Sequence, residues 1–161
     1  MTNLFPMAGR GNRFFQEKYN LPKPLIPIMN KPMFLTSVET FPQADKNVFI
    51  YLKDHEARFQ LESKLSNYLK GTEVVLTDKV TEGQACTCLL AEPLIDKNER
   101  LFIASCDYQM IYDRKKYDQL LLNDDIDVII WTFKIGTIKK ASPNAFAYCR
   151  TEGSRVTEVV E

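Results

Sequence analysis

Two glycines and an arginine follow the first apolar stretch of the chain and form its earliest candidate for phosphate chemistry. The segment at residues 7–14 reads M-A-G-R-G-N-R-F and begins where the apolar residues 3–7 end. Glycine lets the backbone approach a phosphate closely and turn its N–H groups toward it. Arg13 adds a planar, permanent cation suited to phosphate oxygens. Taken alone, this G-x-G segment fits an ordinary tight turn equally well.

A proline-rich segment comes next and contains a lysine between two prolines. Residues 22–33 read P-K-P-L-I-P-I-M-N-K-P-M. Because prolines restrict the backbone, we expect Lys23 to be held in one place. A fixed ammonium beside a pentavalent phosphorus provides the electrostatic stabilisation that phosphoryl transfer requires. Taken alone, the segment also fits an exposed loop with solvated lysines.

Two later segments place polar groups at the ends of expected elements. Residues 81–85, T-E-G-Q-A, open an expected helix, and the Gln84 amide has a donor and an acceptor with which to read a base edge. Asp107 follows the apolar residues 101–105, and Mg²⁺ commonly takes one or two carboxylates together with substrate phosphates. The plainer interpretations are a helix start for Gln84 and a solvated or capping carboxylate for Asp107.

The first two segments together resemble the signature of nucleotide-sugar pyrophosphorylases and related nucleotidyltransferases. That signature is approximately A-G-x-G-T-R followed by P-K-P-L-x-P-x-x-x-K-P-M, and its second half matches at nearly every fixed position. The distance from Arg13 to Pro22 also fits the family. Asn12 replaces the usual threonine, and both side chains form hydrogen bonds. Both halves in order and at this distance are far more specific than either motif alone.

The resemblance implies a role for each candidate residue. Arg13 and Lys23 are the implied catalytic cations, and Asp107 is the implied ligand of a catalytic Mg²⁺. Glu161 is the implied acceptor-binding residue. In the family a lysine follows this glutamate and a second metal-binding aspartate comes later, and neither is assigned here. The implied nucleotide-binding residues are Ala8, Gly9, Gly11, Asn12, Gly83 and Gln84.

Apolar stretches that alternate with amphipathic ones predict an α/β fold. We expect strands at residues 3–7, 47–52, 73–76, 101–105, 127–133, 146–150 and 155–160, and helices at 33–41, 56–69, 83–94 and 115–122. This order predicts a Rossmann-like, doubly wound, mainly parallel sheet with flanking helices. The chain stops in a strand-like segment, so we expect residues 1–161 to be one incomplete domain that lacks about the last third of its family's typical length. We expect this chain to bind nucleotide weakly and to turn over poorly or not at all.

Composition narrows the classes of partner. Hydrophobic residues make up 45% of the 161 residues, enough for one core, and 21 Lys and Arg balance 21 Asp and Glu. No overall charge favours nucleic acid or a membrane surface, no apolar run could span a bilayer, and no signal peptide is recognisable. We therefore expect a cytoplasmic protein. Zinc-site spacing is lacking, and we expect reduced, mostly buried thiols at Cys86, Cys88, Cys106 and Cys149.

These observations predict an enzyme that transfers a nucleoside monophosphate from an NTP to a sugar 1-phosphate or similar phosphorylated acceptor, for surface polysaccharide or glycoconjugate synthesis. The sequence leaves open which base the NTP carries, which acceptor is used and whether the protein forms a homo-oligomer. A nucleotide-sugar-dependent glycosyltransferase is one alternative, although residues 107–109 are not its Asp-x-Asp motif and it leaves the P-K-P loop unexplained. A non-catalytic nucleotide-binding domain is the other, and a turnover assay separates it from an enzyme.

Overall fold

The protein divides into two compact units, and each is described by itself. The computed structural model describes residues 1–11, 20–134 and 146–160. The first unit is Met1–Ile111 and the second is Tyr112–Glu161. Within the described residues, no helix has the length and apolar character needed to cross a membrane.

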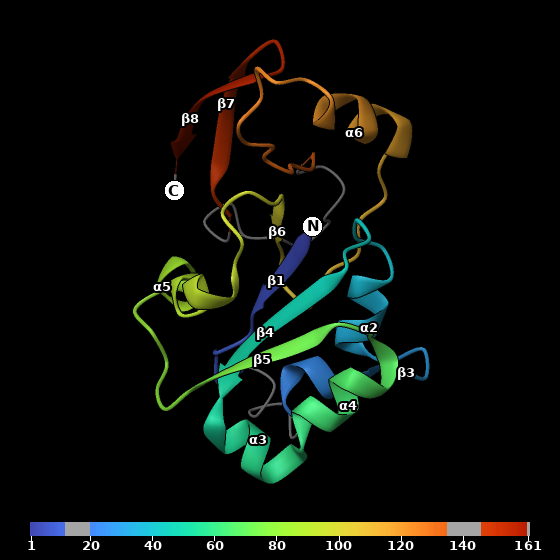
Figure 1. Cartoon of the computed structure of the whole chain (residues 1–161), viewed down its shortest axis with the longest axis vertical. Helices are drawn as coiled ribbons and strands as arrows, with labels where there is room; N and C mark the ends of the chain where they lie inside the picture. Colours follow the sequence, from blue (N-terminus) through green and yellow to red (C-terminus); the bar gives the residue numbers. More distant parts are fainter. Residues whose placement is uncertain (12–19, 135–145, 161) are drawn as a thin grey trace. The chain divides into compact units, whose positions relative to one another are not determined.

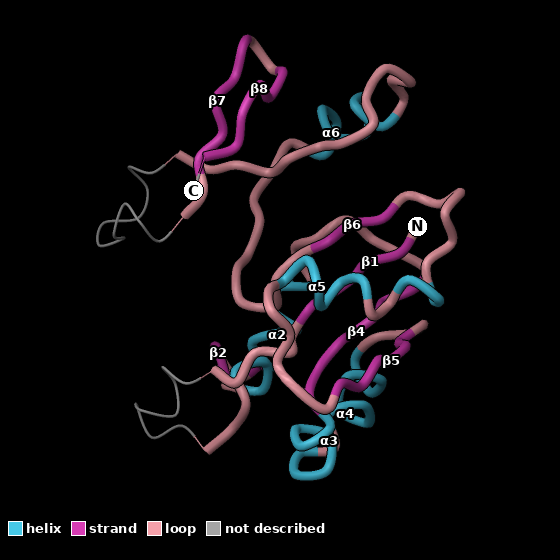
Figure 2. The backbone as a smooth tube through the Cα atoms, turned by 90° about the vertical axis from the view of Figure 1, so that its left-hand side faces the viewer, coloured by secondary structure: helices cyan, strands magenta, loops and turns pink. Residues whose placement is uncertain are grey.

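The first unit is built on a parallel four-stranded sheet. Figure 2 shows the strands side by side in the order β5–β4–β1–β6. Leu4 of β1 lies in register with Val48 of β4 on one side and with Ile103 of β6 on the other. The chain therefore runs outward from β1 to β4 and β5 and then returns to the far side of β1, which confirms the doubly wound arrangement. The strands are β1 (Thr2–Pro6), β4 (Lys46–Leu52), β5 (Thr72–Thr77) and β6 (Leu101–Ile103).

Helices cover both faces of this sheet. Figure 1 shows α5 (Gln84–Leu89) on one side and α2 (Met33–Val38) and α4 (Leu61–Tyr68) on the other. Successive strand residues face opposite sides, so β4 contributes to both layers. Leu4, Val48, Ile50 and Ala91 form the buried cluster on the α5 side. On the other side the Phe34 ring lies 6.3 Å from Phe49 and 6.0 Å from Tyr68.

The expected helix over residues 56–69 is wrong as a single element. The structure has α3 (Lys53–Phe59) and α4, separated at Gln60, whose φ of 52° is left-handed. The Glu56 carboxylate accepts a hydrogen bond of 3.0 Å from the Glu62 backbone N–H and one of 2.7 Å from the Tyr51 hydroxyl. This side-chain contact satisfies a backbone donor at the start of α4, which a helical spacing of apolar residues could not reveal.

The expected helix over residues 83–94 is also shorter in the structure. It begins at Gln84 as expected, but α5 ends at Leu89, and a 3-10 turn at Glu92–Leu94 follows. Pro93 has no N–H with which to continue the helical ladder, so the chain tightens into 3-10 geometry. Met33 begins α2 as expected, but Pro32 lies just before the helix as its N-cap residue rather than in its first turn, and α2 ends at Val38 instead of residue 41.

The second unit contains one helix and one hairpin. Asp113 caps α6 (Arg114–Leu121) by accepting a hydrogen bond of 3.1 Å from the Lys116 backbone N–H. The hairpin pairs β7 (Tyr148–Glu152) with β8 (Arg155–Val160) in antiparallel register. The strand expected at residues 127–133 is wrong, because the structure has no regular element there and leaves Val128 and Phe133 exposed. A β-branched run becomes a strand only where a second strand pairs with its backbone.

Candidate active site

The strand order places the candidate site at one end of the sheet. Beside β1 the order reverses, because the chain continues to β4 on one side and returns to β6 on the other. In doubly wound sheets ligands bind at such a reversal, outside the carboxyl ends of the strands. The glycine loop follows β1 at Met7, whose N–H donates to the Ile50 carbonyl at 2.7 Å. The segment carrying Asp107 leaves β6 at Ala104, whose N–H donates to the Leu4 carbonyl at 3.1 Å.

Lys23 and Asp107 meet at this end of the sheet although 84 positions separate them in the sequence. The Lys23 ammonium donates to Oδ2 of Asp107, and both side chains are only about a third exposed or less. Lys23 begins a 3-10 turn, Lys23–Leu25, in which Pro24 and Leu25 are buried. The proline-rich segment therefore holds the backbone of Lys23, and the long lysine side chain reaches Asp107 from there.

The Asp107 carboxylate is held through both of its oxygens. Oδ1 accepts a hydrogen bond from the Ser105 hydroxyl, while Oδ2 accepts from Lys23. Burial alone raises the pKa of Asp107, but the hydrogen bonds from Lys23 and Ser105 and the charge of Lys23 outweigh burial and bring that pKa below its usual value. The carboxylate is thus fully ionised at neutral pH and available to a cation.

Cys106 lies between these two polar residues and faces the interior. Its side chain is buried, and burial, with a smaller contribution from the Asp107 charge, raises the pKa of its thiol to about 12. A thiol with this pKa is not a nucleophile at neutral pH. Cys106 therefore anchors the segment, which bends at Cys106 and Asp107, and the Ser105 hydroxyl donates to the Asp107 carboxylate across this bend.

The glycine loop approaches the lysine directly. Gly11 has a φ of 64°, and a Cβ added there would lie 3.7 Å from the Cβ of Lys23. Ala8 is buried at the start of the loop, and Arg10 lies 3.7 Å from the Asp54 carboxylate. Asn12 and Arg13, expected in nucleotide binding and catalysis, lie outside the described residues, as does Glu161.

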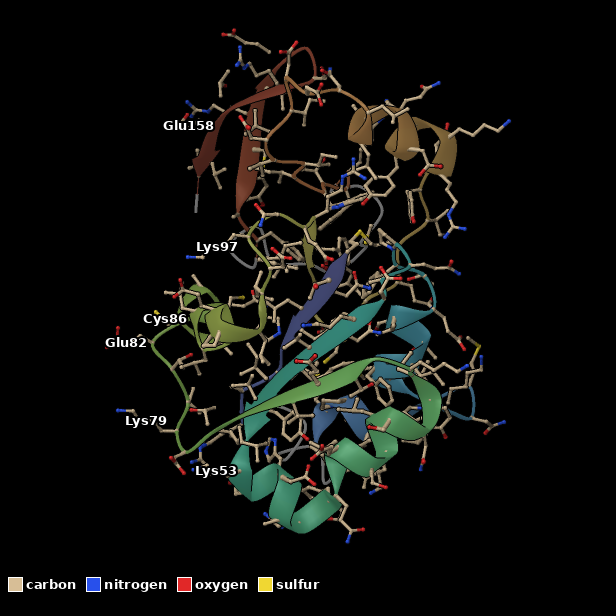
Figure 3. The ribbon with its side chains drawn as sticks, in the orientation of Figure 1. Lys53, Lys79, Glu82, Cys86, Lys97 and Glu158 are labelled. Carbon is tan, nitrogen blue, oxygen red and sulfur yellow. The ribbon has the colours of Figure 1, made fainter. Side chains whose placement is uncertain are left out.

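The segment expected to contact the base is organised by two threonines. Thr81 Oγ1 lies 2.9 Å from the Gly83 carbonyl, to which it donates, and 2.5 Å from Thr87 Oγ1. Gly83 caps α5 and Gln84, its first residue, is exposed. Figure 3 shows Lys79 and Glu82 on the loop before α5 with their side chains pointing away from the sheet. These threonine contacts hold the backbone at Gly83, and the Gln84 side chain is exposed.

Gly9 and Gly83 are glycines that packing among the described residues does not require. A Cβ added at either position would meet no atom of the described residues within 4 Å, and neither residue has a positive φ. Gly83 has a φ of −175°, which any residue adopts. By contrast, Gly11 has a left-handed conformation that favours glycine.

The carboxylate of Asp107, the candidate metal ligand, has the chemistry to bind a divalent cation. Asp107 offers a hard, ionised oxygen, and the Lys23 ammonium already rests on Oδ2 as a cation does. Among the residues that the structure describes, no three His, Cys, Asp or Glu side chains gather into a metal site. The donor set therefore suits an ion that takes most of its ligands from a substrate, which is the usual behaviour of Mg²⁺.

Several residues near these candidates form polar contacts that the sequence did not predict. Ser105 lies two positions before Asp107 and donates a hydrogen bond to its carboxylate. A hydroxyl this close to the expected metal ligand was the one feature of the sequence that could have predicted the contact. Lys53 forms an ion pair of 2.8 Å with Asp78, at the ends of β4 and β5, for which the sequence gives no local signal. The expectation of mostly buried thiols is wrong: all four cysteines are free, but only Cys106 is buried and Cys86 is exposed.

A Rossmann-like sheet with a glycine loop, a lysine and a carboxylate at its switch point is the architecture of a nucleotide-binding enzyme domain. The nucleotidyl transferase family matches residues 7–161, and the chain belongs to this family. A UTP–glucose-1-phosphate uridylyltransferase of Pseudomonas aeruginosa is 35% identical over 78 residues, which cover 44% of this chain and 27% of that protein.

Solved structures show the same fold. A nucleoside-diphosphate-sugar pyrophosphorylase of Vibrio cholerae RC9 aligns with a TM-score of 0.68 at 17% identity over 100% of this chain. A Bacillus anthracis chain described as a glucose-1-phosphate thymidylyltransferase, in complex with sucrose, aligns with a TM-score of 0.71 at 17% identity over 99% of this chain. The protein spans 66% and 63% of these two chains, so it corresponds to less than two thirds of their length.

Proposed function

We propose that this chain forms the nucleotide-binding part of an enzyme that transfers a nucleoside monophosphate from an NTP to a phosphorylated acceptor and releases pyrophosphate. One observation carries the proposal: Lys23, Asp107 and the glycine loop meet at the switch point of the sheet in a member of the nucleotidyl transferase family. Because the family matches residues 7–161, we propose that both compact units belong to one catalytic domain.

The glycines support a nucleotide at this end of the sheet. Glycine at Gly9 and Gly83 is required neither by backbone conformation nor by packing in the part of the protein that the structure describes. A close approach of a ligand to the backbone gives a physical reason for the missing side chains. We propose that Ala8, Gly9, Gly11 and Asn12 bind the phosphates and that Gly83 and Gln84 contact the base.

The proposed chemistry is an in-line displacement. A phosphate oxygen of the acceptor forms a bond to the α-phosphorus of the NTP, and the bond from that phosphorus to the bridging oxygen breaks. Pyrophosphate leaves with the bonding electrons. The acceptor phosphate is already an anion, so no general base is needed. Lys23 and Arg13 neutralise the charge that develops on the phosphoryl oxygens.

Asp107 is the proposed ligand of Mg²⁺, on the donor chemistry described above. When bound, the ion supplies electrostatic stabilisation of the transferring phosphoryl group and of the leaving pyrophosphate. Asp107 contributes an ionised oxygen at low cost, because its pKa is already below the usual value. Ser105 keeps that carboxylate in one orientation through Oδ1.

The proposed acceptor is a sugar 1-phosphate, and Glu161 is proposed to bind it. The names of the uridylyltransferase and thymidylyltransferase relatives make glucose 1-phosphate with UTP or dTTP the first combination to test. A phosphocholine-like acceptor belongs in the same test. We propose a cytoplasmic role in making activated sugars for surface polysaccharide or glycoconjugate synthesis.

The decisive experiment measures pyrophosphate release over a matrix of NTPs and phosphorylated acceptors. We expect release that needs both an NTP and an acceptor, and that Asp107→Asn abolishes. Lys97→Ala is the matched control, because this lysine forms an exposed ion pair with Glu92 and has no proposed role in the site. Acceptor-independent release, or no release from any pair while nucleotide still binds, would mean that the chain alone is not a transferase.

A further inference from the structure

The two oxygens of Asp107 have different partners, and this asymmetry extends the proposed function. Ser105 donates to Oδ1 from two residues away on the same segment. Lys23 donates to Oδ2 from a separate 3-10 turn. One partner is thus tied to the same strand end as the carboxylate, while the other reaches it across the fold on a long side chain.

The two donors also differ in charge and in the flexibility of their side chains. The Ser105 hydroxyl is neutral, and its short side chain keeps it close to Oδ1 in any rotamer change of Lys23. The Lys23 ammonium is a point charge on a flexible four-carbon stem, and it rests on the carboxylate oxygen that a divalent cation also seeks. Two cations cannot share Oδ2 at contact distance without strong repulsion.

We infer that Lys23 and a divalent cation compete for Oδ2 of Asp107, while Ser105 is a positioning residue that holds Oδ1. The inference rests on the proposed function and adds to it an exchange of Lys23 for the metal ion at Oδ2. Lys23 leaves Oδ2 when the cation arrives and becomes available to the triphosphate. In the chain without metal, the same lysine neutralises a half-buried carboxylate.

The test is the binding of Mn²⁺ alone to the 161-residue chain, read by the electron paramagnetic resonance signal of free Mn²⁺ without nucleotide. We expect Lys23→Met to tighten Mn²⁺ binding about two- to fivefold, because it removes a competing ion pair of modest strength. Ser105→Ala should weaken binding about tenfold, as loss of a hydrogen bond to a metal ligand commonly does. Ser105→Thr, which keeps the hydroxyl, should restore binding to within about twofold of the original chain.

The direction of the Lys23→Met effect separates competition from a structural role. A lysine that merely stabilised the loop would leave Mn²⁺ affinity unchanged or lower it when removed, and either result overturns the inference. Failure of Ser105→Thr to rescue binding overturns the role of Ser105, provided that thermal unfolding shows both variants folded. The inference is also overturned if neither the original chain nor any variant binds Mn²⁺, or if Asp107→Asn leaves Mn²⁺ binding undiminished. The pyrophosphate assay tests the proposed function separately, so each can fail without the other.

Discussion

At the residue scale, the chemistry of the candidate site depends on the ionised carboxylate of Asp107. Its neighbours are a lysine that lies between two prolines in the sequence, a serine on its own segment and a buried cysteine. Asp107 is negatively charged at neutral pH because two donors offset the cost of its burial. Substitutions here should therefore change the chemistry more than the fold.

Asp107→Asn should reduce pyrophosphate release by at least about 100-fold, because charge stabilisation by a metal ion is worth several kcal/mol. The amide is close in size to the carboxylate and can still accept a hydrogen bond from Ser105. The measurement is the initial rate of pyrophosphate release together with the far-ultraviolet circular dichroism spectrum. A folded Asn variant with a near-normal rate would remove Asp107 from the mechanism.

Lys23→Ala and Arg13→Ala should each lower kcat by about 100-fold or more while changing KM for the NTP far less, because donors directed at a developing charge act mainly in the transition state. Steady-state kinetics of the two variants separate the two parameters. A raised KM with unchanged kcat would assign these cations to uniform binding of substrate instead.

His55 should make stability depend on pH. It is the only histidine in the chain, and burial, the largest cause, lowers its pKa below the usual 6.5. The unfolded chain then binds a proton more readily than the folded chain. We expect the free energy of unfolding to be highest above about pH 6.5 and to fall as the pH decreases from there through the lowered pKa of the folded state.

Urea unfolding at several pH values, for the original chain and for His55→Gln, measures this dependence. The slope between neutral and mildly acidic pH should be smaller in the variant. The Met1 amine does not contribute in this range, because hydrogen bonds from it to Asp45 and Glu99 raise its pKa from 8.0. Equal slopes in both proteins would show that His55 is not the titrating group.

At the scale of the elements, tight backbone connections decide how strands and helices meet. Gly71 joins α4 to β5 with a φ of 63°, and its carbonyl accepts a hydrogen bond of 2.8 Å from the Asn47 N–H at the start of β4. A Cβ there would collide with the backbone oxygen of Asp45. Gly153 in the β7–β8 turn has nearly the same φ, 60°, but no atom within 4 Å of the added Cβ.

These two glycines form a matched pair for mutation. Gly153→Ala should lower the free energy of unfolding by about 1 kcal/mol, the usual cost of a left-handed conformation for a residue with a side chain. Gly71→Ala should cost about 2–4 kcal/mol, since the backbone collision adds to that term. Denaturation by urea, followed by circular dichroism, gives both values, and equal losses would contradict the collision.

At the scale of the whole molecule, the two units differ in how much core they possess. The first contains every buried residue of the described chain, including Phe5, Phe34 and Phe49. Among the described residues of the second, none is buried, and its aromatic rings contact one another. Its Trp131 ring lies 5.0 Å from Tyr112 and 5.2 Å from Tyr117. A small unit with little burial is expected to open before a well-packed one.

Trp131, the only tryptophan, reports on the second unit by fluorescence. We expect its transition in urea to precede the transition of the circular dichroism signal, which the first unit dominates. Tyr117→Ala should shift the fluorescence midpoint further toward low urea and leave the circular dichroism midpoint nearly unchanged. Coincident transitions in both proteins would show that the two units unfold as one.

Sequence by itself determined the doubly wound fold class and the residues from which a phosphate site could be built. Local signals sufficed there: the glycine loop after the first strand, Lys23 between prolines, and Asp107 after an apolar run. Strands β1, β4, β5 and β6 and the start of α2 follow from apolar runs and Pro32. Each of these features depends on neighbours within a few positions, which a sequence displays directly.

Tertiary structure alone decided which of those residues meet. The Lys23–Asp107 pair and its approach to Gly11 depend on the strand order beside β1, and the Ser105 hydrogen bond was visible only as a spacing. The strand expected at residues 127–133 is missing, because a strand requires a pairing partner that the run itself does not supply. Contacts between distant segments become favourable only once the chain is folded, so no local pattern records them.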